Sequence, residues 1–262
     1  MSKTHQNLTG TLVDFILYEL YHILYNEIEP NDTRSQAQEI QENQSTPEGM
    51  YNPTLGGTYQ MNGNSSINDE DWFKVNLTKG TKYMTCGEKA FDFLIEDSAG
   101  NVITKKAYST SPRVFAFEIP ADGLYYVRIK GISSEQTKYL FYVGSPVYAV
   151  GSVIIPCNTP TINMTGGTKT AYFDSTNLNI PKNAVVTSLT FNNIRTTDVK
   201  SIILTNNNSG INLTMNQSSW DKDHLESMHL PAVTMWTAQF GYNKTTSFNP
   251  TIKMYYVYPI YP

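Results

Sequence analysis

The stretch Glu27-Ile-Glu-Pro-Asn-Asp-Thr33 decides how this chain is interpreted, together with Asp69-Glu-Asp-Trp-Phe73 further along. Both stretches concentrate oxygen-bearing side chains ahead of sequence rich in β-forming residues. Calcium takes roughly six to eight oxygen ligands from carboxylates, amide carbonyls and the backbone. The two stretches therefore predict a calcium site, and its candidate ligands are Glu27, Glu29, Asn31, Asp32, Asp69 and Asp71. A plainer interpretation stays open, in which these acids only cap and solvate a turn.

Several motifs between residues 26 and 144 follow one another in the order and spacing of a known family. They are E-x-E-P-N-D-T, Gly56-Gly57, D-x-D-W-F-K-V, and the segments 93–100 and 120–128. Over these residues the chain resembles the bacterial pre-peptidase C-terminal domains, whose relatives include the collagen-binding domains of clostridial collagenases. This resemblance implies a small jelly-roll-like β-sandwich of the kind appended to exported proteins, which binds or targets and does not catalyse.

The same resemblance implies which residues hold the metal. It makes the N-terminal acids Glu27, Glu29, Asn31 and Asp32 the ligands of the linker, and Asp71 the carboxylate before the aromatic pair. The family pattern has a second acid two or three places earlier, where this chain offers Asn68 and Asp69. Both remain candidates.

Composition is compatible with two domains. The chain has 262 residues, of which 40% are hydrophobic and 12% aromatic, and domains commonly contain about 100–150 residues. Only 16% are charged, so Asn, Thr and Ser must cover much of the surface, which suits β-sandwich faces. No basic run alternates with aromatic residues, so we expect no nucleic-acid partner.

Short alternating runs bounded by Gly, Pro, Asn or Asp predict strands in both halves of the chain. In the first half these runs are 71–77, 82–86, 92–96, 113–119, 124–130 and 139–143. In the second half they are 148–155, 168–174, 185–191, 200–205, 211–215, 233–240 and 251–258. The segment 178–188 makes the second half loosely similar to small exported Bacillus and prophage β-proteins.

The predicted fold class is all-β, with two antiparallel jelly-roll-like β-sandwiches preceded by one N-terminal amphipathic helix. The predicted parts are the helix at 1–26, an acidic and polar linker at 27–50, and sandwiches at 51–145 and 146–262. The linker boundary follows from the polar run 34–50, and the sandwich boundary from Ser145-Pro146.

The segment Thr11–Tyr25 predicts the helix, because its apolar residues cover a wide face. It is too short to span a membrane, at about fifteen residues against the roughly twenty required. Asp14 and Glu19 interrupt it, so we expect no signal peptide. Three interpretations of residues 12–24 are open: docking on the chain's own sandwich, contact with another copy in a homo-oligomer, or binding at a membrane surface.

Catalytic motifs are nearly absent. His224 and His229 are five residues apart, which is not the spacing that places two zinc ligands on one helix face. Asp221 and Asp223 could bind a second cation, although such pairs are common in solvated loops. Trp220, beside Asp221, is the tryptophan best suited to an exposed contact, but a place in the core is the favoured interpretation for it too.

Two cysteines, Cys86 and Cys157, could form one disulfide in an oxidising compartment or remain free and buried.

The function predicted from these observations is a non-catalytic calcium-binding module that acts at the surface of a Gram-positive bacterium or outside the cell. The alternative is a structural protein that assembles with itself, such as a spore-surface, crystalline-inclusion or appendage component. Because no signal peptide is recognised, deposition inside the cell is also open.

Overall fold

The chain divides into two compact units in a computed structural model that describes residues 22–50, 57–88, 91–107, 113–242 and 244–261. Unit 1 comprises the chain up to Val147 together with Ile260–Pro262, and unit 2 is Tyr148–Pro259. Strands dominate both units, and the helical elements among the described residues are 3₁₀ turns of three residues. The all-β prediction is therefore confirmed.

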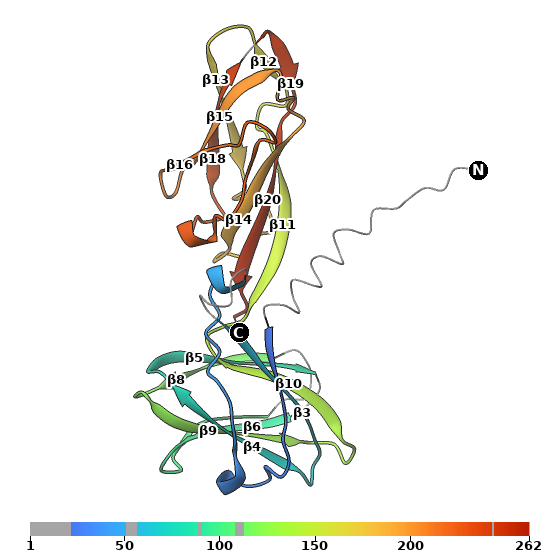
Figure 1. The fold of residues 1–262 in the computed structure, drawn as a ribbon, viewed down its shortest axis with the longest axis vertical. Helices are drawn as coiled ribbons and strands as arrows, with labels where there is room; N and C mark the ends of the chain where they lie inside the picture. The colour runs from blue at the N-terminus through green and yellow to red at the C-terminus, as the bar shows by residue number, and fades with distance from the viewer. Residues whose placement is uncertain (1–21, 51–56, 89–90, 108–112, 243, 262) are drawn as a thin grey trace, which may run out of the picture. The chain divides into compact units, whose positions relative to one another are not determined.

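Unit 1 consists of two five-stranded sheets that form separate layers (Figure 1). The first sheet has the order β1-β3-β10-β5-β8, with bounds His22–Asn26, Thr58–Ser65, Thr137–Gly144, Gly80–Glu88 and Arg113–Ile119. The second has the order β2-β4-β9-β6-β7, with bounds Gln38–Glu39, Glu70–Leu77, Gly123–Gly131, Phe91–Asp97 and Val102–Ala107. Pairs are antiparallel except β1 with β3 and β2 with β4.

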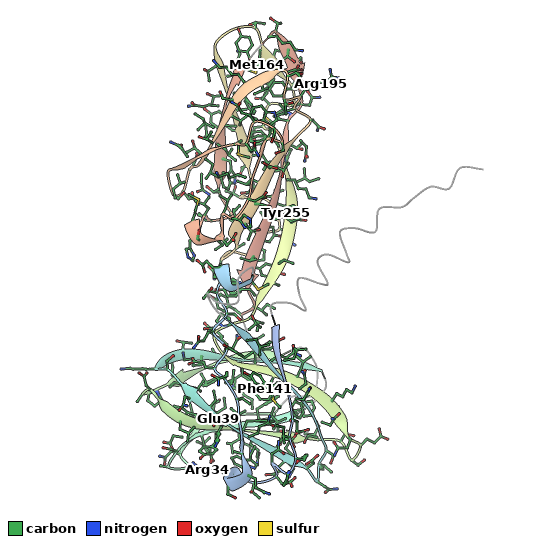
Figure 2. The ribbon with its side chains drawn as sticks, in the orientation of Figure 1. Arg34, Glu39, Phe141, Met164, Arg195 and Tyr255 are labelled. Carbon is green, nitrogen blue, oxygen red and sulfur yellow. The ribbon has the colours of Figure 1, made fainter. Side chains whose placement is uncertain are left out.

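The core of unit 1 lies between these sheets because successive side chains of a strand point to opposite faces. In β4 the buried positions are Asp71, Phe73, Val75 and Leu77, and they alternate with more exposed ones. Phe141 on β10 packs against Phe73, with ring centroids 5.2 Å apart (Figure 2). Asp71 thus puts a carboxyl group into an inward row that is otherwise apolar.

Residues 34–50, expected as a polar connector, contribute to unit 1. They contain η1 (Arg34–Gln36), β2 and η2 (Glu48–Met50). Asn43 is fully buried: its side-chain amide donates to the Ser145 carbonyl at 2.7 Å, and its Oδ1 accepts from Ser45 and from the Tyr59 N–H. These contacts hold the segment against the sandwich.

Arg34 anchors the start of this segment to the β6–β7 hairpin (Figure 2). Its Nη2 donates to the carbonyls of Asp97 and Ser98 at 2.7 Å, and its Nε lies 3.1 Å from Glu96 Oε1. Its guanidinium also stacks 4.2 Å from the centre of the Tyr126 ring. The planar guanidinium fork can make all these contacts at once, which fixes the chain just beyond the acidic stretch.

Unit 2 contains two four-stranded sheets and one strand pair. One sheet has the order β11-β20-β14-β17, with bounds Tyr148–Pro156, Thr251–Pro259, Val185–Asn192 and Asp221–Lys222. The other has the order β13-β18-β15-β16, with bounds Thr168–Asp174, Met235–Tyr242, Val199–Asn206 and Ile211–Thr214. The pair is β12 (Ile162–Met164) with β19 (Thr246–Phe248), and the turn η4 (Glu226–Met228) precedes β18.

Unit 2 has its own core, which includes Trp220 and Trp236, each at most 1% exposed. Trp220 therefore lies in the core and does not form an exposed contact. Trp72 in unit 1 is the half-buried tryptophan.

The prediction of an N-terminal helix is wrong for the few residues of that helix that the structure describes. Residues 22–25 were expected in its last turn, but they belong to β1, which pairs with β3 from His22 opposite Thr58 onward. This long-range pairing overrides the local helical pattern. The rest of the predicted helix, and most of the proposed oligomer contact at 12–24, lies outside the described residues. No helix among the described residues is long and apolar enough to cross a membrane.

Candidate metal centre

Two turns of unit 1 bring the predicted ligands together. Glu27 follows β1 and its N–H donates to the Asn62 carbonyl at 2.8 Å, while the Asn31 carbonyl accepts from the Trp72 N–H at 2.9 Å. Asp69 lies in the turn between β3 and β4, where its carbonyl accepts from the Ser65 hydroxyl at 2.8 Å. The acidic stretch 27–32 is therefore held beside the start of β4.

The carboxylates form two groups that share Glu29. Glu27, Glu29 and Asp71 form the first group, and Glu29, Asp32 and Asp69 form the second. Within each group, one oxygen atom per residue lies within 4.8 Å of the others. All five predicted carboxylates thus belong to one cluster, which we call the acidic cluster. Of the two candidates before Asp71, Asp69 belongs to it, whereas the Asn68 side chain is exposed.

Three buried oxygen atoms at the acidic cluster accept no hydrogen bond from the described residues. They are Asn31 Oδ1 and both carboxyl oxygens of Asp71, and both residues are completely buried. An unpaired buried acceptor costs about 1–3 kcal/mol, and more if it is charged. The amide nitrogen of Asn31 is directed to Glu27 Oε1 at 3.4 Å, which leaves its oxygen free for another partner.

Burial, followed by the charge of Glu27, raises the pKa of Asp71 to about 9. Burial also raises the pKa of Glu29; the Asn31 N–H, which donates to Glu29 at 2.9 Å, opposes that shift, and the charges of neighbouring carboxylates add to it. Like charges at such separations disfavour ionisation. A cation would reverse this effect, because it favours the ionised carboxylates.

Tyr139 on β10 was not among the predicted site residues, yet it supports the acidic cluster. Its hydroxyl donates to Glu27 Oε1 at 2.7 Å, and the Asn64 N–H donates to Glu27 Oε2 at 3.0 Å. Burial, and then the charges of Asp71 and Glu27, raise the pKa of Tyr139 above its ordinary value, so the hydroxyl keeps its proton. A hydroxyl has one hydrogen to donate, and Glu27 receives it.

Gly63 makes the position of Tyr139 possible. The two residues are opposite each other in the β3–β10 pair. A Cβ atom at position 63 would lie 2.2 Å from the Tyr139 hydroxyl oxygen and 2.3 Å from Cζ, distances that no real side chain adopts. The sequence gives no signal for this pair, because the two residues are 76 positions apart and meet only through strand pairing.

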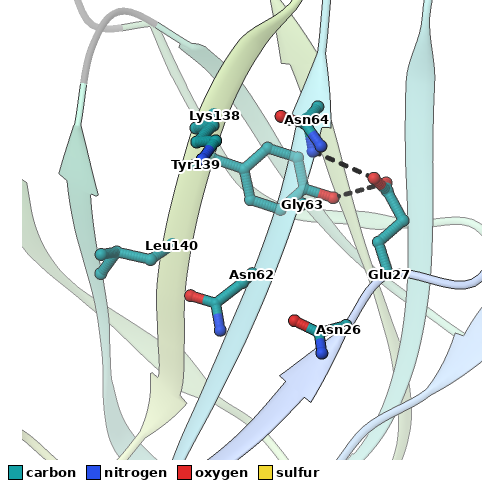
Figure 3. Close-up of a pocket in the computed structure, with 8 residues that line it drawn as sticks. All are labelled: Asn26, Glu27, Asn62, Gly63, Asn64, Lys138, Tyr139 and Leu140. Atoms are coloured by element: carbon teal, nitrogen blue, oxygen red, sulfur yellow. Dashed lines mark hydrogen bonds between the residues drawn. The ribbon is translucent and has the colours of Figure 1, made fainter.

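A cavity of about 410 Å³ adjoins the acidic cluster (Figure 3). Glu27 and Tyr139 line it from the side of the acidic cluster, and Asn26, Asn62, Asn64 and Lys138 add further polar side chains. Figure 3 shows these residues at the end of β1, in the second half of β3 and in the first half of β10, with Glu27 hydrogen-bonded to Tyr139 and Asn64. Glu27 therefore belongs to both the cavity and the acidic cluster.

The other candidates from the sequence do not join a comparable group. Among the described residues, neither Asp221 nor Asp223 belongs to a group of three side chains that could hold a metal. His224 has its Nδ1 3.7 Å from Glu226 and is almost fully exposed. Cys86 and Cys157 are both buried and neither is part of a disulfide, which agrees with the second of the two alternatives given by the sequence.

The residues of the acidic cluster fit a calcium ion. Calcium prefers carboxylate and amide oxygens, and the acidic cluster with Asn31 offers only such atoms from side chains. The residues that would hold the ion are Glu27, Glu29, Asn31, Asp32, Asp69 and Asp71.

Comparison with solved structures supports the fold. The chain matches no protein-family model and no curated protein. It is similar to a putative secreted protein from Eubacterium rectale, with 11% identity and a TM-score of 0.54, over 92% of this chain and 88% of the other. At this identity the likeness concerns the fold alone.

Two further solved structures are similar at low TM-scores. The pre-peptidase C-terminal domain of a collagenase from Bacillus anthracis aligns over 45% of this chain and 99% of its own, with 13% identity and a TM-score of 0.30. The PBSX exported protein XepA aligns over 75% of this chain and 84% of its own, with 8% identity and a TM-score of 0.27. The link to the pre-peptidase C-terminal domains is thus partial and weak.

Proposed function

We propose that unit 1 binds calcium at the acidic cluster and that the protein is a non-catalytic binding or targeting module, acting at a bacterial surface or outside the cell. The observation that carries the calcium proposal is the set of unpartnered buried oxygens of Asn31 and Asp71 beside two groups of carboxylates. Buried polar atoms normally have a hydrogen-bond or ion partner, and an ion at the acidic cluster would supply one for these three oxygens.

Calcium would tie two parts of unit 1 together. Glu27, Glu29 and Asp32 come from the stretch before η1, whereas Asp69 and Asp71 come from the β3–β4 turn and from β4. An ion held by both parts binds only to the folded protein, in which the two parts lie together. It therefore stabilises the fold by mass action, by about 2.7 kcal/mol when the free calcium concentration is a hundred times the dissociation constant. The module would therefore be stable where calcium is plentiful, which is outside the cell.

The calcium proposal is tested by isothermal titration calorimetry and by thermal unfolding of the full chain in calcium and in chelator. Glu29→Gln removes the carboxylate that both groups share, and we expect calcium affinity to fall at least about tenfold, a change of about 1.4 kcal/mol. Glu39→Gln is the matched control, since Glu39 is exposed and lies 3.8 Å from its ion-pair partner, Lys74. It makes the same change of charge in the same segment and should bind calcium normally.

Two results would contradict the calcium proposal. The first is a full-length protein whose unfolding temperature is the same in chelator and at millimolar calcium, the weak end of the range for extracellular calcium modules. The second is a Glu29→Gln variant that gains as much stability from calcium as the unchanged protein does.

A further inference from the structure

One edge strand of unit 2 lacks the features that normally prevent pairing with another chain. Strand β11 is the outermost strand of its sheet, and among the described strands it pairs only with β20 (Figure 1). Its nine residues pair with β20 without a register shift, and none of them is charged. Its one proline, Pro156, is its last residue. Such an edge presents unpaired backbone N–H and C=O groups, which are a template for a further strand.

The other edge strands that the structure describes are protected from such pairing. Three of them contain charged residues: Lys105 and Lys106 in β7, Arg113 and Glu118 in β8, and Lys169 and Asp174 in β13. The remaining ones have five residues or fewer. Charged side chains and short length are two common ways in which sheets avoid edge-to-edge contact. Within this part of the chain, β11 is therefore the exception.

The outward face of β11 is apolar and exposed. Val150 and Ile154 are each 59% exposed, and the exposed Ser152 lies between them on the same face. Tyr255 of β20, opposite Ser152, is 39% exposed and extends this surface across the strand pair (Figure 2). Lys253, the charged residue of β20, lies 4.6 Å from the centre of the Tyr255 ring. The face of β11 itself therefore carries no charge that would repel another copy.

The order of residues in β11 fits pairing with a second copy of the same strand. When two identical strands pair antiparallel about a two-fold axis, residues equally far from the axis along the two strands face each other. Ser152 is the central residue of Tyr148–Pro156. An axis at Ser152 places Val150 of each copy opposite Ile154 of the other, and it brings the two serine hydroxyls together. Cross-strand pairs of this kind stabilise a sheet, and Val and Ile fit its pleated surface.

We propose that β11 pairs antiparallel with β11 of a second copy of this chain, about a two-fold axis at Ser152, and so joins two four-stranded sheets into one. The symmetric placement of Val150 and Ile154 favours a second copy over an unrelated strand. The pairing does not depend on calcium, because the acidic cluster belongs to unit 1 and β11 to unit 2. A dimer carries two copies of unit 1, so a partner bound by both is held with a higher avidity than by one.

Sedimentation equilibrium of the full chain, in calcium and in chelator, measures this association. We expect a dimer with the same dissociation constant in both. Val150→Lys combined with Ile154→Lys places like charges opposite each other and should weaken the dimer at least about tenfold. Val150→Lys combined with Ile154→Glu places opposite charges there and should restore most of the association. Both sites are exposed, so both variants should fold.

A matched control places the same charges on the other sheet of unit 2. Tyr172→Lys combined with Ile203→Lys also replaces two exposed apolar side chains by lysine, on β13 and β15. This variant should dimerise as the unchanged protein does.

Cysteine crosslinking tests the position of the axis. Opposite residues of an antiparallel pair have Cα atoms about 4.5–5.5 Å apart, which is within the range of a disulfide. Ser152→Cys should therefore give a covalent dimer under mild oxidation, while the buried Cys86 and Cys157 should not react. Val150→Cys is the control, because the two copies of position 150 would lie about 13 Å apart along the strands. It should crosslink far less.

The outcomes decide the proposal and separate it from the calcium site. A full chain that stays monomeric at millimolar concentration overturns the proposal, as does a dimer that forms equally well with both positions changed to lysine. Equal crosslinking by Val150→Cys and Ser152→Cys refutes the axis at Ser152. Dissociation of the dimer in chelator also overturns the proposal. A protein that binds no calcium but dimerises through β11 refutes the calcium site alone.

Discussion

Replacing Gly63 with alanine should disturb both the fold and the acidic cluster. The new Cβ would lie 2.2 Å from the Tyr139 hydroxyl oxygen, so the tyrosine must leave its position. Tyr139 is 2% exposed and packs edge-on to Phe73 and Phe91, which leaves it little room to move. The substitution therefore breaks the 2.7 Å hydrogen bond to Glu27 and distorts the core.

The expected loss can be estimated from these two effects. A hydrogen bond to a charged group contributes about 1.5–3 kcal/mol, and overpacking a core costs about 1–3 kcal/mol. We expect the free energy of unfolding in calcium to fall by about 3–5 kcal/mol, and calcium affinity to fall with it because Glu27 loses its support. Urea unfolding in calcium and in chelator measures the first quantity, and calorimetry measures the second.

Three further variants make this prediction specific. Gly123→Ala is the control, since its Cβ would meet nothing within 4 Å, and it should change stability by less than about 0.5 kcal/mol. Tyr139→Phe removes the hydroxyl and should cost about 1.5–3 kcal/mol. In a Tyr139→Leu variant, which lacks the ring, the additional change Gly63→Ala should lower the free energy of unfolding little further. A loss below about 1 kcal/mol for Gly63→Ala alone would refute the reasoning.

Three other predictions concern charge, a buried ion pair and the thiols. In the folded metal-free protein the pKa of Asp71 is raised from 3.8 to about 9, because the fold disfavours the ionised carboxylate. The free energy of unfolding in chelator should therefore fall as the pH rises from about 4 to about 9. The same unfolding series in calcium should not show this loss. An equal dependence of the unfolding free energy on pH in calcium and in chelator would contradict the assignment of Asp71 as a calcium ligand. Lys82 and Glu42 form a buried ion pair at 2.6 Å, so Glu42→Ala should cost about 3–5 kcal/mol in urea unfolding by leaving the lysine unpaired; a loss under about 1 kcal/mol would argue against a buried pair. Because neither Cys86 nor Cys157 is part of a disulfide, the unfolding temperature should be the same with and without reductant, and a drop on reduction would indicate a disulfide.

Much of the fold was predictable because burial alternates along most strands. The runs predicted at 113–119 and 168–174 coincide with β8 and β13. β3 is not among the predicted alternating runs, because its sequence, Thr-Tyr-Gln-Met-Asn-Gly-Asn-Ser, has the Asn and Gly content of a turn. It is a strand because it pairs with both β1 and β10, a partnership that spans distant parts of the chain.

The candidate site was predictable for the residues that carry oxygen ligands in local motifs. The stretches 27–32 and 69–71 each signal metal chemistry on their own, and the structure brings them into one cluster. Tyr139 and Gly63 could not be found in the same way, since a buried tyrosine and a strand glycine have ordinary packing roles in most β-sandwiches. Their part depends on β3–β10 register, which a single sequence does not reveal.

The measurement that tests the central claim most directly is calorimetric titration of the metal-free full chain with calcium, repeated with Glu29→Gln. The account predicts saturable calcium binding by the unchanged protein and binding at least about tenfold weaker in the variant. An unchanged protein that gives no binding isotherm up to millimolar calcium, or a variant that binds as tightly as the unchanged protein, would contradict it.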